Sequence, residues 1–470
     1  MNIQPVLLWT DVLIFVLIAC AFALTLHARQ RPPLREAWRR VGQQPAAMAA
    51  ATLLLCFAVV GILDSFHYRA QLPQAPGQEA GKAAVYSTEV LSALDTLLEP
   101  LRRDTEKTYS EPFARTLFQR ETIELAEGGQ ARVYPPLEHG ARHLGAEDSV
   151  AADVVARLAV ALIPALLFTV GVGMVLALGV ARGRRCTLPE AACFILRGQT
   201  ALAWRAVLVV TGGVAVLVAW AVELAPLYHV LGTDKVGQDI LYLSLKSIRT
   251  GLVIGTLTTL VMMPFAVAFG IAAGYLGGWV DDVIQYLYTV LNSIPSVLLI
   301  AAAVLMMQVV IDIHPQWFET AAQRADARLL ALCVILGITS WTGLCRLLRG
   351  ETLKLRELEY VQAARAFGVS TVTILRRHIL PNVMHIVLIT VVMDFSGLVL
   401  AEAVLSYVGI GVDPGTISFG TMINMARAEL AREPMVWWSL AAAFVFMVTM
   451  VLAANLLADA VRDAFDPRRA

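Results

Sequence analysis

Residues 158–181 read LAVALIPALLFTVGVGMVLALGVA and contain no charged side chain. A helix of this length rises about 36 Å, which is enough to cross the ~30 Å hydrocarbon core of a bilayer. Eight further runs that are uncharged or nearly uncharged lie at residues 5–26, 46–63, 206–222, 251–275, 284–309, 329–345, 384–409 and 436–458. The sequence therefore predicts an all-α polytopic membrane protein with about nine transmembrane helices.

The composition supports this class of protein. Of the 470 residues, 58% are hydrophobic and only 16% are charged, whereas the surface of a soluble protein of this size would need more charge. The 37 Lys and Arg residues balance the 37 Asp and Glu residues, so no overall field favours a nucleic acid as partner. The first apolar run has no basic approach and no small-residue cleavage site. We expect it to be a retained span and not a signal peptide.

The six cysteines indicate no metal or redox site. None is part of a CxxC pair, and most lie in apolar runs where cysteine behaves as a small hydrophobic residue. They are Cys20, Cys56, Cys186, Cys193, Cys333 and Cys345.

Positive charges predict the orientation, because Lys and Arg accumulate in cytoplasmic loops. Four connections are rich in Arg, at residues 29–40, 182–197, 346–377 and 462–469. All four lie on one side if the N-terminus is outside and nine spans follow. A short turn at Asp281 and Asp282 belongs to that side but carries no positive charge. Residues 346–382 are therefore expected to be cytoplasmic.

Residues 65–153 are expected to form a small α+β domain on the outer face. Within them, ETIELAEGGQARVYP (121–135) predicts a hairpin around Gly128-Gly129, which could cover a helical apolar stripe. The stripe comprises Val90, Leu91, Leu94, Leu97, Leu98 and Leu101. His139 and His143 have the spacing of helical metal ligands, but Gly140 and nearby Pro residues favour a loop, so no metal is expected. A second outer segment, residues 231–251, is predicted to dip toward the membrane surface.

The polar stretch EYVQAARAFGVSTVTILRRHILPN (359–382) interrupts two apolar runs. Tyr360, Ala363, Ala364 and Phe367 share one face of a short predicted helix, and this face could press into a groove on another protein. Gly368 permits a turn. A second amphipathic helix is then expected to end at Leu380-Pro381, which redirects the chain into the next span. A cationic loop that contacts lipid head groups is the alternative interpretation.

The pattern AA-x3-G-x11-LP in this stretch resembles the EAA loop of permease subunits of ATP-binding-cassette (ABC) importers. Dipeptide and oligopeptide permeases with a MetI-like core are more similar still. The similarity runs from about residue 204 to the C-terminus. It includes LGTDKVGQDIL (231–241), GYLGGWVDD (274–282), EAVLSYVGIGVDP (402–414) and NLLADAVRDAFDP (455–467).

The resemblance implies a division at residue 203. Residues 204–470 would be the MetI-like permease core, with its EAA loop at 346–382. Residues 1–203 would be an extension that holds three of the spans and the outer domain at 65–153. The role of this extension stays unassigned.

The resemblance also implies a multi-pass protein of the bacterial inner membrane and a set of partners. These are a second homologous permease, two ABC ATPases, a substrate-binding protein outside the cell and membrane lipid. The ATPase-coupling residues would be Tyr360, Gln362, Ala363, Ala364, Phe367, Gly368, Leu380 and Pro381. Gln362 replaces the Glu that names the EAA loop, and Gln238 stands where relatives often have Arg.

No phosphate-binding GxxxxGK[ST] motif is present, and the nearest string, PGQEAGKA (76–83), has the wrong spacing. The chain is therefore expected to be a transport subunit without an ATPase site or a bound cofactor. ATP and Mg²⁺ would be used by the partner ATPases.

Two acids lie inside the eighth predicted span, where ionisable residues commonly mark a solute or ion pathway. Asp394 lies near its middle, and Glu402 lies two turns further toward the outside. They are candidates for a translocation pathway. The alternative is that a partner such as Asn455 or a backbone group satisfies them.

The sequence leaves three classes of function to compare. The favoured one is half of an import pathway for dipeptides, oligopeptides or similar small solutes; a nickel chelate or an opine would suit the same fold. An ion-driven secondary transporter would show two similar halves with interrupted helices, and no such internal repeat is visible. A membrane-embedded enzyme would require a cluster of His or carboxylates at one depth, which two acids do not make.

Overall fold

The structure is a computed structural model that describes residues 3–71, 86–124, 130–145, 148–413 and 415–465. The chain forms two compact units, each described by itself. The first comprises Met1–Val6, Arg39–Thr250 and Ile417–Ala453, and the second comprises Leu7–Trp38, Gly251–Thr416 and Ala454–Ala470. Helices α2 (Pro32–Gln43), α9 (Ile240–Leu276) and α18 (Trp438–Phe465) contribute to both.

The first unit combines helices with two small antiparallel sheets. One sheet has the order β1-β2-β3, and the other is the β4-β5 hairpin. The strands are β1 (Ile3–Val6), β2 (His67–Ala70), β3 (Leu91–Ser92), β4 (Glu121–Glu124) and β5 (Gln130–Val133). The helices are α3 (Pro45–Asp64), α4 (Ala93–Leu97), α5 (Glu99–Arg103), α6 (Val150–Arg184), α7 (Leu188–Leu196), α8 (Trp204–Leu224) and α17 (Phe419–Glu429).

The second unit is helical in its described part. Its elements are α1 (Trp9–Gln30), α10 (Gly278–Ser293), α11 (Ser296–Ile313), the short 3-10 turn η1 (Pro315–Trp317), α12 (Ala321–Ser340), α13 (Thr342–Arg356), α14 (Glu359–Ala366), α15 (Thr371–Ile374), the π-helical segment η2 (Leu375–Ile379) and α16 (Leu380–Tyr407).

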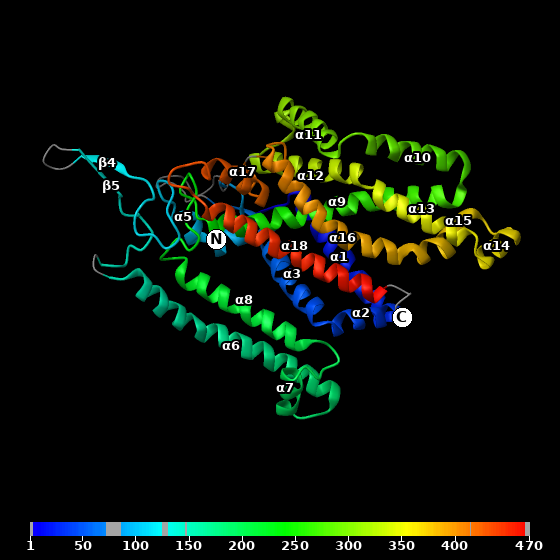
Figure 1. The fold of residues 1–470 in the computed structure, drawn as a ribbon, viewed down its shortest axis with the longest axis horizontal. Coiled ribbons are helices and arrows are strands. Elements are labelled where there is room, and N and C mark those ends of the chain that lie inside the picture. The colour runs from blue at the N-terminus through cyan, green and yellow to red at the C-terminus, as the bar shows by residue number, and fades with distance from the viewer. Residues whose placement is uncertain (1–2, 72–85, 125–129, 146–147, 414, 466–470) are drawn as a thin grey trace, which may run out of the picture. The chain divides into compact units, whose positions relative to one another are not determined.

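The predicted membrane class is confirmed. Among the described residues, eight helical stretches are long and apolar enough to cross a membrane, and α1 adds a shorter apolar stretch at Trp9–Ala23. Figure 1 shows α6 and α8 running side by side, with α7 between their connected ends. Leu167 on α6 is 68% exposed and Val209 on α8 is 67% exposed, which suits helices whose outer faces contact lipid.

One predicted span has the wrong boundaries. The sequence favours a single helix over residues 284–309, but α10 ends at Ser293 and α11 begins at Ser296. Ile294 between them is extended, because the ring of Pro295 disfavours the helical conformation in the residue before it. Only α11 of the two is long and apolar enough to be a span.

Residues 65–153, called the outer region below after their predicted side, are partly as predicted. The β4-β5 hairpin is confirmed, although its turn at Gly128-Gly129 lies outside the described residues. The single helical stripe from Val90 to Leu101 is wrong. Leu91 is in β3, a capping box at Ser92 starts α4, and α5 begins anew with Pro100 in its first turn.

The stripe also packs differently from the prediction. Leu101 is buried against Tyr109, Ile240 and Trp438, whereas Val133 on the hairpin is 40% exposed. Leu101 and Tyr109 therefore pack against segments from residue 240 onward, all within the first unit.

Residues 240–250 do not form a separate segment that dips toward the surface. They are the first turns of α9, which runs without a break from Ile240 to Leu276, and Ile240, Ser244 and Ile248 are buried. Lys246 carries a charge into this buried stretch, but its Nζ lies 2.6 Å from Asp64 Oδ1 and 3.0 Å from Asp95 Oδ1. These ion pairs make the buried course of the helix possible.

The second unit is held together by backbone contacts at glycines. A Cβ at Gly270 would lie 2.8 Å from the carbonyl oxygen of Cys345, and a Cβ at Gly274 would lie 2.7 Å from that of Arg349. Glycines four residues apart thus let α9 approach α13 closely, as small-xxx-small patterns do in membrane helices. Around this contact lies a core that includes Met262, Ile284, Leu348, Val361, Ile374 and Val383.

The predicted orientation can be tested with single cysteines. Ser110, in the outer region, is buried and therefore unsuitable, but its neighbour Glu111 is exposed. Cysteine at Glu111 is expected to react with a membrane-impermeant maleimide in intact cells. Cysteine at the exposed Ser370 is expected to react only after the membrane is opened, with the parent chain as the background for both. The reverse pattern would invert the topology.

Candidate functional site

The predicted EAA loop is a helical hairpin. Helix α13 continues to Arg356, so only residues 357–382 form the projecting part, which is called the hairpin loop below. Helix α14 carries the first half. Gly368 then takes φ +75°, a conformation that side chains with a Cβ resist, and the chain turns into α15. The predicted glycine turn is present.

The face of α14 proposed for docking is divided. Phe367 is 88% exposed, and Tyr360 and Ala363 are exposed beside it. Ala364 is only partly exposed, because it packs on the core of the second unit together with buried Val361. Tyr360 is held in place by a hydrogen bond that Asn382 Nδ2 donates to its hydroxyl, at 3.0 Å. Of the four residues proposed for docking, Tyr360, Ala363 and Phe367 therefore form the exposed part.

Leu380-Pro381 does not redirect the chain as predicted. Leu380 and Pro381 begin α16, and the helical stretch continues from Thr371 to Tyr407. The five preceding residues, Leu375–Ile379, are π-helical, which accommodates a proline that lacks an N–H and crowds the preceding turn. Arg376 and Arg377 face outward while Ile374 is buried, as predicted.

Gln362, the residue that departs from the EAA pattern, bonds within its own loop. Its Nε2 donates to the carbonyl oxygen and to Oε2 of Glu357, at 3.3 and 3.2 Å. Both groups are exposed, so these bonds contribute little. We expect Gln362→Ala to reduce the transport rate less than twofold, measured as initial uptake at equal protein level. A tenfold loss would instead assign this side chain a contact with a partner.

An ion pair joins α13 to the turn at Asp281 and Asp282, which is distant from it in the sequence. Arg349 on α13 donates Nε and Nη2 to the two oxygens of Asp281, at 2.6 and 2.7 Å. The geometry is bidentate, which is the strongest arrangement of these groups. Arg349 thus supplies the positive charge that the turn at Asp281 and Asp282 lacks.

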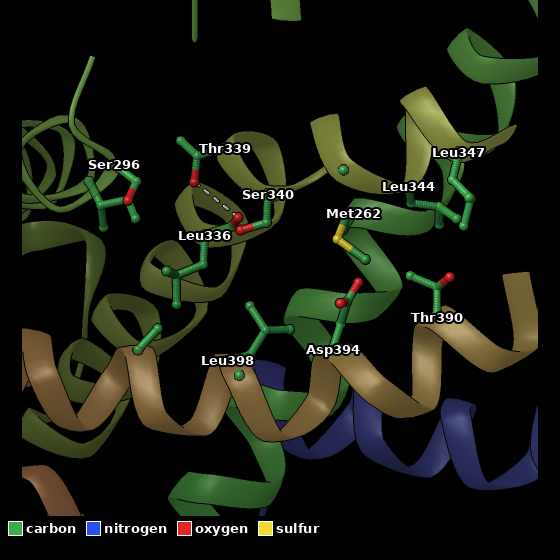
Figure 2. Close-up of a pocket in the computed structure, with 14 residues that line it drawn as sticks. Met262, Ser296, Leu336, Thr339, Ser340, Leu344, Leu347, Thr390, Asp394 and Leu398 are labelled. Carbon is green, nitrogen blue, oxygen red and sulfur yellow. Dashed lines mark hydrogen bonds between the residues drawn. The ribbon is translucent and has the colours of Figure 1, made fainter. Parts of the chain in front are cut away.

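The two candidate pathway acids occupy different environments. Asp394 lines a pocket of about 530 Å³ within the second unit, together with residues of α9, α11, α12 and α13 (Figure 2). Glu402 is buried, accepts a hydrogen bond from Ser406 Oγ at 2.7 Å and is not among the pocket residues. Asn455 is exposed, and no hydrogen bond joins it to either acid in the described part of the chain.

A polar cluster within the first unit was missed entirely. Glu106 of the outer region accepts hydrogen bonds from the amides of Glu138, His139 and Gly140, at 2.8–3.0 Å. His229 lies between two acids, with Nε2 3.3 Å from Glu106 Oε1 and Nδ1 2.9 Å from Asp239 Oδ2. Glu106, His229 and Asp239, all buried, are called the outer clamp.

The backbone tightens this clamp. The Glu106 amide donates to the carbonyl oxygen of Gly237 at 3.0 Å, and Ser110 accepts from Thr233 through its backbone oxygen at 3.1 Å. A Cβ at Gly237 would lie 1.7 Å from the Glu106 carbonyl oxygen. Residues 104–110 therefore lie directly on the 231–241 segment. Only the paired glycines of LGTDKVGQDIL hint at this approach in the sequence.

The clamp is expected to be pH-dependent. Burial opposes the charge of Glu106, but hydrogen bonds from His229 and the three amides outweigh it and lower its pKa from 4.5 to about 2. Burial likewise opposes the charge of His229, yet Asp239 and Glu106 raise its pKa from 6.5 to about 9. The Glu106 contribution is present above pH 4.5 and lost toward pH 2; the His229 contribution is present below pH 6.5 and lost toward pH 9.

We therefore expect the outer region to be most resistant to proteolysis between about pH 4.5 and 6.5. Limited digestion of the purified chain at pH values from about 2 to about 9 measures the resistance on both sides of this range. Glu106→Gln keeps the shape but removes the charge, so the loss of resistance on acidification should flatten in this variant. An unchanged acid profile in Glu106→Gln would assign the pH dependence to groups other than Glu106.

The histidines weighed as metal ligands contact separate acids. His139 and His143 lie in turns, as predicted, and His143 Nε2 lies 2.9 Å from Asp153 Oδ2. His139 Nδ1 lies 3.7 Å from Asp104. Within the described ranges, no three His, Cys, Asp or Glu side chains form a group that could hold a metal.

Comparison with known proteins identifies a family for this chain. Residues 266–470 match the family model of the binding-protein-dependent transport system inner membrane component. The oligopeptide transport system permease protein of Mycobacterium tuberculosis (strain ATCC 25618 / H37Rv) is 32% identical over 239 residues, which is 51% of this chain and 76% of the relative.

Two further relatives carry other solute names. The glutathione transport system permease protein of Pectobacterium atrosepticum is 33% identical over 240 residues, or 51% of this chain and 73% of its own length. The dipeptide transport system permease protein of Lactococcus lactis subsp. cremoris is 30% identical over 240 residues, or 51% of this chain and 64% of its own length.

Proposed function

Because the chain belongs to the family of binding-protein-dependent transport system inner membrane components and is an ABC permease of the inner membrane, we propose that it forms half of the pathway that imports peptides. The other half is a second, homologous permease. Relatives named for oligopeptide, dipeptide and glutathione transport support a peptide solute. A nickel chelate or an opine is the alternative solute.

The hairpin loop couples this permease to its ATPases. The observation that carries this proposal is Phe367, an aromatic side chain 88% exposed at the tip of a loop whose base is anchored by buried Val361 and Ile374. An exposed aromatic on a rigid support is the form that docking side chains commonly take. Tyr360, Gln362, Ala363, Ala364, Gly368, Leu380 and Pro381 shape and support that surface.

The anchoring explains how the loop transmits movement. Val361 and Ile374 belong to the same packed core as residues of α9, α13 and α16. A displacement of the loop by closing ATPases would therefore shift these helices together, since a packed core transmits strain. ATP and Mg²⁺ bind to the ATPase subunits and not to this chain.

Solute passes through the second unit along the pocket that Asp394 lines. Its volume falls within the range of small-molecule sites, ~300–1,000 Å³, and its wall contains helices of the same core. Glu402, which bonds to Ser406, supports the outer half of α16 beside this pathway.

Co-purification tests the proposal. The chain, tagged at its C-terminus and extracted from the native membrane in mild detergent, is expected to elute with a second permease and two ATPases. Phe367→Ala should elute with the second permease but with little ATPase. Recovery of the chain alone, in a state that remains folded by size-exclusion chromatography, would contradict the assembly.

A further inference from the structure

Asp394 is the charged residue of a pocket that is otherwise apolar or hydroxylic. Figure 2 shows its carboxylate directed toward Met262, with Thr390 one turn earlier on the same helix and Ser340 across the pocket. Thirteen other residues line the pocket, and none of them is charged. Among the residues that the structure describes, none donates a hydrogen bond or an ion pair to Asp394.

Such a carboxylate is unfavourable unless something compensates it. Ionised groups within membrane-spanning segments are costly and normally face a cavity or a partner of opposite charge. This chain provides the cavity, and its described residues provide no cation. Arg349 belongs to α13, one of the helices that line the pocket, but it is already bound to both oxygens of Asp281.

The remaining polar groups of the pocket suit a cationic ligand that donates hydrogen bonds. Ser296, Thr339, Ser340 and Thr390 contribute hydroxyl groups to its wall. Thr339 donates its proton to the carbonyl oxygens of Ile335 and Leu336, so toward a ligand its oxygen can act only as an acceptor. An ammonium group has three N–H donors and no acceptor, so it suits a pocket whose wall offers a carboxylate and hydroxyl oxygens.

We propose that this pocket is a binding site for the primary ammonium group of the transported solute, with Asp394 as the residue that selects it. The inference rests on the proposed function, since it assumes that solute passes through the second unit. The ligand class is a small molecule with a free amine and a compact apolar body, such as a peptide with an unblocked N-terminus. Acylation of the amine would remove the recognised group.

The first test probes the charge preference of the pocket without any transport. Thr390→Cys places a thiol one helical turn from Asp394, where side chains i and i+4 are neighbours. Its modification by a cationic (aminoethyl) and an anionic (sulfonatoethyl) methanethiosulfonate is followed at residue 390 by peptide mass spectrometry. Each rate is divided by the rate of that reagent with free 2-mercaptoethanol, which removes intrinsic differences in reactivity.

With Asp394 present, the normalised cationic rate is expected to exceed the anionic rate by roughly tenfold or more. In Thr390→Cys/Asp394→Asn the ratio should fall close to one. Thr390→Cys/Asp459→Asn is the matched control, because Asp459 is an exposed carboxylate outside the pocket, and it should keep the ratio of Thr390→Cys alone. Alanine amide should slow the cationic reagent only when Asp394 is present.

Two results would overturn the inference. One is an equal ratio in Thr390→Cys and in Thr390→Cys/Asp394→Asn. The other is that Cys at position 390 reacts in the isolated chain but reacts with neither reagent in the assembled complex. This result would mean that a partner subunit occupies the pocket.

The second test separates this inference from the proposed function. Cells with the complete transporter are given labelled dialanine or N-acetyl-dialanine. Asp394→Asn is expected to reduce dialanine uptake at least tenfold and to erase the preference over the acetylated form. If the labelling shows the cation preference but Asp394→Asn takes up dialanine normally, the pocket binds amines off the pathway, and the pathway assignment fails. If neither solute enters wild-type cells while the labelling result holds, the proposed peptide solute fails alone.

Discussion

A Phe367→Ala permease is expected to insert and fold normally, yet to transport almost no solute. The side chain is 88% exposed, so its loss removes no packing within this chain. In the proposed complex it fills a pocket of the ATPase, and truncation of such an aromatic anchor costs about 2 kcal/mol or more of binding free energy, roughly a 30-fold loss of affinity. Solute uptake and ATPase co-purification in detergent measure the two consequences.

Two further variants test whether the effect of Phe367→Ala is specific to this face of the hairpin loop. Val372→Ala removes another exposed apolar side chain, on α15 and not on α14, and should transport normally. Gly368→Val should resemble Phe367→Ala, because a β-branched residue at φ +75° strains the turn by about 1–3 kcal/mol and displaces α14. Normal uptake in both Phe367→Ala and Gly368→Val would exclude this loop as the coupling element.

Gly237→Ala is expected to detach the outer region from the 231–241 segment. The new Cβ would lie 1.7 Å from the carbonyl oxygen of Glu106, and the residue has φ +76°. Strain and the lost hydrogen bond from the Glu106 amide together cost about 2–4 kcal/mol. Thermal unfolding of the purified chain and protease cleavage within residues 104–118 should both reveal the change.

Gly213→Ala is the matched control. Gly213 lies within α8 of the same unit, and a Cβ there meets no atom within 4 Å. This variant should be as stable as the wild type or slightly more stable, because alanine favours helix. If Gly237→Ala unfolds at the same temperature as Gly213→Ala and resists protease equally, then the contact between Glu106 and Gly237 does not hold the outer region.

The membrane class and the hairpin loop could be predicted because their signals are local. Runs such as residues 158–181 lack charge over the full length of a span, and no tertiary contact can reverse that signal. Gly368 likewise indicates a turn because it lies between two amphipathic segments. The conformation of the turn does not specify a function, and the expected function came from the resemblance to EAA loops.

The outer clamp could not be predicted because its members are far apart in the sequence. Glu106 and His229 are 123 residues apart, and neither belongs to a motif. The burial of Lys246 could not be predicted for the same reason. Its partners Asp64 and Asp95 belong to the extension, and the polarity pattern of its own helix gives no sign of them. Helical periodicity predicts which residues share a face with Ala364, but it does not predict which face the rest of the protein covers.

The different environments of Asp394 and Glu402 could not be predicted either. Eight residues separate them on one helix, and the sequence offered the same environment to both. Ser406, one turn beyond Glu402, accounts for the difference, since its hydroxyl satisfies that acid locally. Asp394 has Leu398 at the corresponding position, four residues toward the C-terminus, and a Leu side chain offers no hydrogen bond.

The attachment of residues 104–110 to Gly232 and Gly237 bears on how the extension can be handled in protein engineering. A Cβ on Gly232 would collide with the carbonyl oxygen of Ser110, and a Cβ on Gly237 would collide with that of Glu106. The contact between the two segments therefore requires glycine at both positions. A chimera that joins the extension to another permease at residue 203 would separate the two halves of this joint. A transplant that keeps the joint must carry residues 229–241 along with the graft, as a discontinuous insert with two splice points.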